Sequence, residues 1–156
     1  GNWLPDFRKF RFTIVFSGCN TICMVAGYQY KVSKTCVYNI NYHFVWSPKY
    51  RRPCLVGNIA DDLKKLIRAK AEERDIKIEA LEVMPDHVHV FVSAKPSLSP
   101  HLIVKYFKGA GSLLLREKYP QLKKMTSLWS RSYYCGTVGS VSDSVVRTYI
   151  ENQKGK

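Results

Sequence analysis

The sequence predicts an α+β fold of the ferredoxin-like (RRM-like) type, β-α-β-β-α-β, with helices on one face of an antiparallel sheet. A further helix, bearing a tyrosine, is expected at the C-terminal end. Two observations predict this fold class. Short β-type runs alternate with two long amphipathic helical patterns in that order, and 156 residues suffice for one hydrophobic core but not for two. The 46% apolar content is that of a globular protein and excludes collagen-like, disordered and membrane-bundle classes.

The first strand and helix follow from residue type and spacing. Residues 35–46 (TCVYNINYHFVW) are rich in β-branched and aromatic side chains and stop at Ser47-Pro48, which predicts a strand. Residues 58–74 (NIADDLKKLIRAKAEER) repeat apolar side chains at helical spacing, with carboxylates in the first turn. We expect an amphipathic helix there, capped by Asn58.

A hairpin comes next. Residues 77–84 and 87–93 are short β-type runs, and Pro85-Asp86 between them is typical of a tight turn. The two runs should therefore pair as antiparallel strands.

The remaining elements complete the pattern. Residues 99–118 predict a second helix with two glycines, Gly109 and Gly111, in its middle; a close approach of another segment would explain them. Residues 128–138 predict a strand, and residues 142–153 a short terminal helix. The apolar stripe expected on the second helix comprises Leu102, Ile103, Tyr106, Phe107, Leu113 and Leu114.

Residues 1–27 differ from the rest and are interpreted as an extension of unknown role, with the domain covering residues 28–156. A basic stretch leads into an apolar run, which has the outline of a secretory signal, but polar residues interrupt the run. The run is too short and too polar to span a bilayer, so no membrane partner is expected. Five scattered cysteines form no paired framework, which favours a reducing compartment, the cytoplasm.

The charge balance points to a polyanionic partner. Lys and Arg total 25 against 12 Asp and Glu, a formal net charge of +13. Nucleic acid is the leading candidate, because each neutralised phosphate releases condensed counterions. A basic surface that serves only solubility is the alternative.

His87-Val88-His89 is a candidate metal-binding pair. Alternate residues of a strand share a face, so the two imidazoles project together, about 7 Å apart at the backbone, while Val88 points the other way. A pair of surface or core histidines has the same spacing, so the tripeptide alone leaves both readings open.

Tyr149 and Gln153 lie four residues apart in the predicted terminal helix and therefore on one helix face. A phenol beside an amide oxygen offers a nucleophile next to a metal ligand. The alternative is a core aromatic on an amphipathic helix.

Together these motifs resemble the HUH single-tyrosine transposases of the IS200-like insertion-sequence family. The histidine pair follows EVMPD (82–86), and YIENQ (149–153) comes far downstream. FVWSPKYRR (44–52), YFKG (106–109) and LWSRSY (128–133) agree with the same family. The resemblance covers residues 30 to 154 and not the N-terminal extension.

The resemblance implies a set of roles. Tyr149 would be the nucleophile, and His87, His89 and Gln153 would hold a divalent ion, Mg²⁺ or Mn²⁺. Such enzymes bind single-stranded DNA, with a hairpin at the ends of an insertion sequence, and cut it through a 5′-phosphotyrosine bond. They act as homodimers, and whether the tyrosine helix would serve its own subunit or its partner stays open.

DNA contacts are expected from basic and aromatic side chains near the predicted strand ends. Trp46 and Trp129 are either stacking residues or core. The other candidates are Lys49, Tyr50, Arg51, Arg52, Lys105, Lys108 and Arg131.

Two other functions compete with a transposase. Replication and mobilisation nicking enzymes also use a histidine pair, but they usually carry further domains that 156 residues cannot hold. A non-cleaving module, such as a domesticated relative, would bind single-stranded nucleic acid on the same sheet without needing Tyr149 and Gln153.

Overall fold

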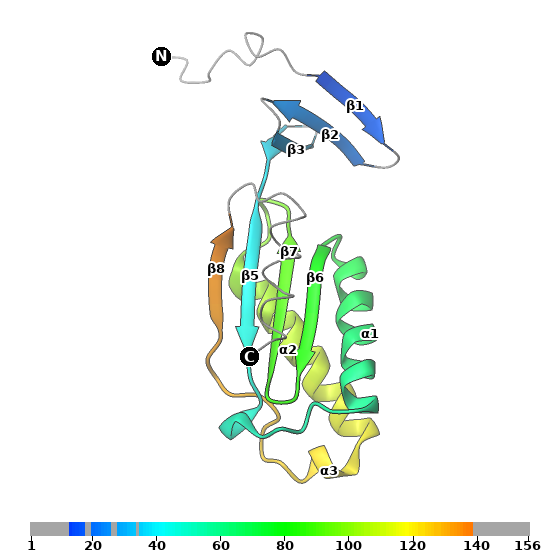
Figure 1. Cartoon of the computed structure of the whole chain (residues 1–156), viewed down its shortest axis with the longest axis vertical. Helices are drawn as coiled ribbons and strands as arrows, with labels where there is room; N and C mark the ends of the chain where they lie inside the picture. Colours follow the sequence, from blue (N-terminus) through cyan, green and yellow to red (C-terminus); the bar gives the residue numbers. More distant parts are fainter. Residues whose placement is uncertain (1–12, 18–19, 26–27, 34, 139–156) are drawn as a thin grey trace. The chain divides into compact units, whose positions relative to one another are not determined.

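The computed structural model describes residues 13–17, 20–25, 28–33 and 35–138 (Figure 1). The helix predicted at residues 142–153 lies outside them. The chain divides into two compact units, Gly1–Asn39 and Ile40–Lys156.

The N-terminal unit contains a small antiparallel sheet with the strand order β1-β2-β3-β4. Its strands are β1 (Thr13–Ser17), β2 (Asn20–Val25), β3 (Tyr28–Val32) and β4 (Val37–Tyr38). The prediction of one strand over residues 35–46 was therefore wrong in its extent, because β4 ends at Tyr38 and a separate strand begins at Asn41. Residue composition suits both strands and does not reveal the break between them.

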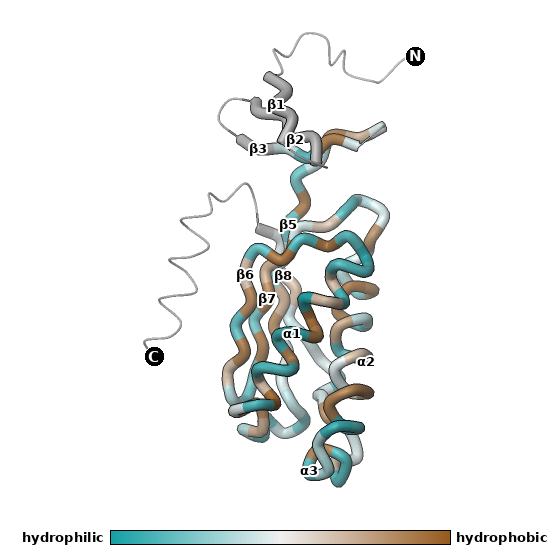
Figure 2. Tube along the Cα trace, turned by 90° about the vertical axis from the view of Figure 1, so that its right-hand side faces the viewer, coloured by the Kyte–Doolittle hydropathy of each residue, from teal (hydrophilic) through white to brown (hydrophobic). Residues whose placement is uncertain are grey.

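The C-terminal unit contains the second sheet, with the antiparallel order β6-β7-β5-β8. Helices α1 and α2 lie on one side of it (Figure 2). Its elements are β5 (Asn41–Trp46), the 3₁₀ turn η2 (Lys49–Arg51), α1 (Asn58–Glu73), β6 (Lys77–Met84), β7 (His87–Ser93), α2 (Pro100–Lys118), α3 (Pro120–Lys123) and β8 (Tyr134–Val138).

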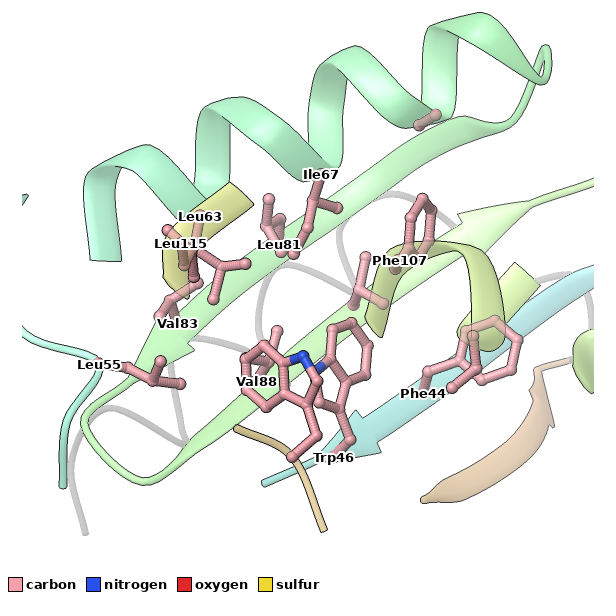
Figure 3. Packing of buried hydrophobic residues seen from close by; sticks show 14 of the residues in the cluster. Phe44, Trp46, Leu55, Leu63, Ile67, Leu81, Val83, Val88, Phe107 and Leu115 are labelled. Carbon is pink, nitrogen blue, oxygen red and sulfur yellow. The ribbon is translucent and has the colours of Figure 1, made fainter. Parts of the chain in front are cut away.

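Alternation along the central strands separates the two sheet faces. Val88, Val90 and Val92 of β7 are fully buried, as is Phe44 of β5, and they pack with the helices. The close-up of the core shows Phe44, Trp46 and Val88 with Phe107 of α2 (Figure 3). Each such side chain contributes about 1.5–3 kcal/mol on burial. The histidines of β7 alternate with these valines and so belong to the opposite face.

The hairpin was predicted correctly, since β6 pairs with β7 from Met84–His87 outward. The predicted cap of α1 was wrong. Gly57, with a φ of 56°, occupies the N-cap position, and Asn58 is already the first helical residue. A positive φ suits a glycine, which has no Cβ to clash with the chain.

The stripe predicted on α2 was right for Ile103, Phe107 and the partly buried Tyr106, but its other three residues were wrong. The buried face continues at four-residue spacing through Gly111 and Leu115. Leu102, Leu113 and Leu114 are exposed instead, at 53%, 70% and 41%. Leu113 lies two residues from both Gly111 and Leu115, about 200° around the helix from each, so it points away from the core.

The last strand is shorter than predicted, Tyr134–Val138 rather than residues 128–138. Ahead of it, Trp129 forms only an isolated bridge with Pro48, and its buried ring packs on α2. A Cβ on Gly111 would lie 3.3 Å from the Trp129 ring, which explains that glycine as expected. No atom of the described residues lies within 4 Å of the same position on Gly109.

Candidate metal and DNA-binding site

His87 and His89 lie side by side on the sheet face opposite the helices. Their ring centroids are 4.8 Å apart and the rings meet edge to face. Both side chains are partly buried, whereas Val88 and Val90, on the other face, are fully buried. The strand period alone places them there.

The Nδ1 atom of His87 is committed to Asp86. It lies 2.6 Å from Oδ1 of that carboxylate, and Arg51 Nη2 lies 2.8 Å from Oδ2. The hydrogen bond from His87, followed by that from Arg51, lowers the pKa of Asp86 against the opposing effect of burial. An ionised carboxylate only accepts, so His87 donates from Nδ1, and the neutral form of such a ring has its lone pair on Nε2.

The Nδ1 atom of His89 is committed as well, to a third imidazole. His43 Nε2 lies 3.1 Å from it. Burial, with a smaller contribution from His89, lowers the pKa of His43 to about 4. Burial and the nearby His87 also lower the pKa of His89, while Glu82, directly across on β6, opposes that change. The imidazoles of His43 and His89 are therefore neutral near pH 7, and the neutral imidazole is the form that binds metal ions.

The donor set fits a divalent ion in part. Each histidine of the pair has a partner at Nδ1, and no described residue bonds its Nε2, the arrangement that usually supports metal-binding histidines. Among residues 35–138 and the described strands before them, no group of three His, Cys, Asp or Glu side chains is placed to hold a metal. Gln153, the expected third ligand, and Tyr149, the expected nucleophile, lie outside the described residues, and their roles stay predictions.

The loop after β5 gathers three of the predicted DNA-binding residues. Tyr50 is 77% exposed. Lys49 Nζ lies 5.4 Å and the Arg52 guanidinium 5.8 Å from the centre of its ring. Its φ of 61° is unusual for a bulky side chain. An exposed ring with two cations close to it is suited to stacking on an unpaired base beside a phosphate.

The other predicted DNA-binding residues differ in how they are held. Arg51 pairs with Asp86. Lys108 Nζ donates to the carbonyl oxygens of Ser130, at 2.7 Å, and Ser132, at 3.2 Å, and burial lowers its pKa. Lys105 and Arg131 are exposed.

Trp46 and Trp129 belong to the core. They are 2% and 6% exposed and meet edge to face, with ring centroids 6.2 Å apart. Of the two readings of these residues, the core reading is the correct one.

Comparison with known proteins places the chain in a family. The family model described as "Transposase IS200 like" matches residues 36–153. The chain belongs to the IS200-like transposase family. The ISDra2 transposase TnpA of Deinococcus radiodurans is 38% identical over 131 residues, which are 82% of this chain and 94% of that protein. The transposase for insertion sequence element IS200 of Salmonella typhimurium is 32% identical over 119 residues, 74% of this chain and 78% of that protein.

One solved structure agrees with this membership, and a second supports the fold. A crystal structure of a protein from Deinococcus radiodurans R1, described as a transposase, has a TM-score of 0.67 at 37% identity and covers 79% of this chain and 97% of its own. A REP-associated tyrosine transposase bound to a REP hairpin has a TM-score of 0.55 at 16% identity. It covers 80% of this chain and 74% of its own, and at that identity it supports the fold alone.

Sequence reasoning missed two features of the site of this IS200-like transposase. One is the contact of His43 with His89, and the other is the hydrogen bond of Asp86 to His87. A signal for His43 was present. In the strand NYHFVW, successive side chains point to opposite faces of the sheet. His43 therefore faces away from Phe44 and Trp46, toward the face that carries the histidine pair.

No described helix is long and apolar enough to cross a membrane.

Proposed function

We propose that this chain is a transposase that binds the single-stranded DNA ends of an insertion sequence and cuts and rejoins them through Tyr149. The observation that carries the proposal is the histidine pair, in which both Nδ1 atoms have partners and neither Nε2 atom is bonded by a described residue. His87 and His89 would hold a divalent ion, Mg²⁺ or Mn²⁺, with Gln153 as the third protein ligand. Membership of the IS200-like transposase family supports this assignment.

The chemistry is an in-line displacement at phosphorus. The Tyr149 oxygen forms a bond to the scissile phosphate while the bond from phosphorus to the DNA 3′-oxygen breaks, and a 3′-hydroxyl and a 5′-phosphotyrosine result. The ester keeps the energy of the broken bond, so a DNA 3′-hydroxyl rejoins strands by the reverse reaction. A free tyrosine has a pKa of about 10 and is a poor nucleophile at pH 7. A bound divalent ion supplies Lewis-acid stabilisation of the phosphate charge and of the attacking oxygen.

We assign the second sheet to the ferredoxin-like type, with a C-terminal tyrosine helix after β8. The order of its elements, β5-α1-β6-β7-α2-β8, supports this assignment. The loop of Lys49, Tyr50 and Arg52 would contact unpaired bases, and a hairpin at the element end would be the recognised feature. A homodimer acting in the cytoplasm completes the proposal.

The test is a covalent adduct with DNA. The whole chain is incubated with Mg²⁺ or Mn²⁺ and a 3′-labelled single strand from the end of its own element, then separated in SDS. We expect a labelled protein band that is lost in Tyr149→Phe and kept in Tyr119→Phe, which changes a tyrosine bonded to Asp62 of α1. Persistence of the band in Tyr149→Phe would assign the nucleophile to another tyrosine.

A second arm separates catalysis from binding. His87→Ala should abolish the adduct while single-stranded DNA binding stays within about threefold, since a positioned metal serves the reaction more than the affinity. Sequence-independent binding without any adduct, in the wild-type chain with either ion, would favour the non-cleaving module instead.

A further inference from the structure

A third histidine lies next to the pair, on the neighbouring strand. We propose that His43 is a positioning residue, which accepts a hydrogen bond from Nδ1 of His89 and thereby presents Nε2 of His89 to the metal ion. This inference rests on the metal site of the proposed function. It adds a residue 46 positions away in the sequence to the two histidines of the motif.

The sheet register brings the two rings together. On β5 and β7, Val45 is directly opposite His89 and Phe91 is directly opposite His43. His43 is thus a diagonal neighbour of His89 on the same face, close enough for the two imidazole rings to touch. The contact runs from His43 Nε2 to His89 Nδ1 at 3.1 Å, a hydrogen-bonding distance for nitrogen atoms.

The His43 ring is held on several sides. It stacks on Phe91, with centroids 4.3 Å apart and an interplanar angle of 4°. The ring of Tyr134 on β8 meets it edge-on at 5.7 Å. Gly136 is directly opposite His43 on β8, and a Cβ there would lie 2.6 Å from the Tyr134 hydroxyl. With only 8% of His43 exposed, its packing sets the direction in which Nε2 points.

The proton count then assigns both tautomers. A metal ion held by Nε2 of His89 would take the lone pair of that atom, so the ring proton of a neutral His89 would be on Nδ1. That N–H donates to His43 Nε2, which must carry no proton, and His43 keeps its own proton on Nδ1. Asp86 serves His87 in the same way, so each histidine of the pair has one partner that fixes its tautomer.

The experiment measures Mn²⁺ affinity in the whole chain by electron paramagnetic resonance, without DNA. His43→Phe preserves the stack on Phe91 but has no acceptor, whereas His43→Gln keeps a polar atom at a similar reach. We expect His43→Phe to lose about 10–100-fold in affinity. His43→Gln should stay within about threefold of wild type, as a side chain that still accepts the hydrogen bond. Thermal unfolding of each variant reports its folding.

His87→Ala separates this inference from the proposed function. If His87→Ala leaves Mn²⁺ binding unchanged, the metal site is wrong and the role of His43 falls with it. If His87→Ala abolishes binding and a folded His43→Phe keeps wild-type affinity, the positioning role alone is overturned.

A measurement on the wild-type chain avoids any folding defect. Long-range ¹H–¹⁵N spectra with saturating Mg²⁺ should show His43 protonated on Nδ1 and His89 protonated on Nδ1. The opposite tautomer at His43 would overturn the proposal.

Discussion

Arg51 and Asp86 form an ion pair at 2.8 Å that joins the loop after β5 to the turn of the β6–β7 hairpin. The other oxygen of Asp86 holds His87. A residue predicted from sequence to bind DNA is therefore linked, through one carboxylate, to a predicted metal ligand.

Asp86→Ala should lower Mn²⁺ affinity by about tenfold or more, because His87 Nδ1 loses its acceptor. Arg51→Ala is the matched control. Its pair with Asp86 is partly exposed and worth at most about 1 kcal/mol, so a loss below about fivefold is expected. Calorimetric titration of both variants checks the order, and an equal loss in the two would contradict it.

Tyr50→Ala should weaken binding of a single-stranded oligonucleotide by about 1–3 kcal/mol, the usual value of one stacked base. Tyr50→Phe keeps the ring and should bind like wild type. Fluorescence anisotropy measures both. Unchanged affinity in Tyr50→Ala would remove this loop from the DNA path.

Both Lys108 and Lys105 were predicted to bind DNA, but we expect their substitution to affect different properties, stability for Lys108 and DNA binding for Lys105. Lys108→Met leaves the carbonyls of Ser130 and Ser132 without their donor, and about 1–3 kcal/mol of unfolding free energy should be lost. Lys105→Met should change stability by less than about 0.5 kcal/mol. It should also reduce the salt dependence of single-stranded DNA binding, by about 0.7 in the logarithmic slope for each phosphate that Lys105 neutralises.

Urea unfolding and binding at several salt concentrations test this contrast. A stable Lys108→Met variant with a reduced salt slope would mean that Lys108 binds phosphate after all.

Gly109 and Gly111 offer a second matched pair. Gly109→Ala adds a methyl group where no atom of the described residues lies within 4 Å, and it should stabilise the protein by up to about 1 kcal/mol through helix propensity. Gly111→Val pushes against Trp129 and Leu63 and should destabilise it by about 1–3 kcal/mol. The difference in urea midpoint between the two variants is the measurement, and similar midpoints would speak against the close approach of Trp129.

Asp62 makes stability depend on pH. Lys118 Nζ lies 2.6 Å from its carboxylate, and Tyr119 donates to it; these two hydrogen bonds, Lys118 first, lower the pKa of Asp62 below its ordinary 3.8. The folded state thus favours the charged form. The stabilisation is complete above the unfolded pKa and is lost as pH falls through the folded one.

Urea midpoints measured from about pH 5 down to about pH 2 should therefore fall less steeply in Asp62→Asn than in wild type. Lys118→Met should flatten the same part of the profile. An Asp62→Asn profile that parallels wild type would show that this carboxylate does not control acid stability.

The sequence alone determined what depends on neighbours along the chain. Alternation in His87–Ser93 separated the histidine pair from the buried valines, and spacing in α1 placed its helix, because both patterns are set by local backbone geometry. The turn at Pro85-Asp86 likewise specified the hairpin. The phase of α2 and the ends of β4 and β8 were not determined, since apolar and aromatic residues there suit more than one local structure.

Only the tertiary structure decided which distant side chains meet. His43 reaches His89 because β5 pairs with β7 in one register, and Arg51 reaches Asp86 because its loop lies beside the hairpin turn. Lys108 is held by carbonyls of the segment before β8. Local periodicity fixes the face on which a residue lies but not the strand that will lie next to it; that choice is made by packing of the whole core.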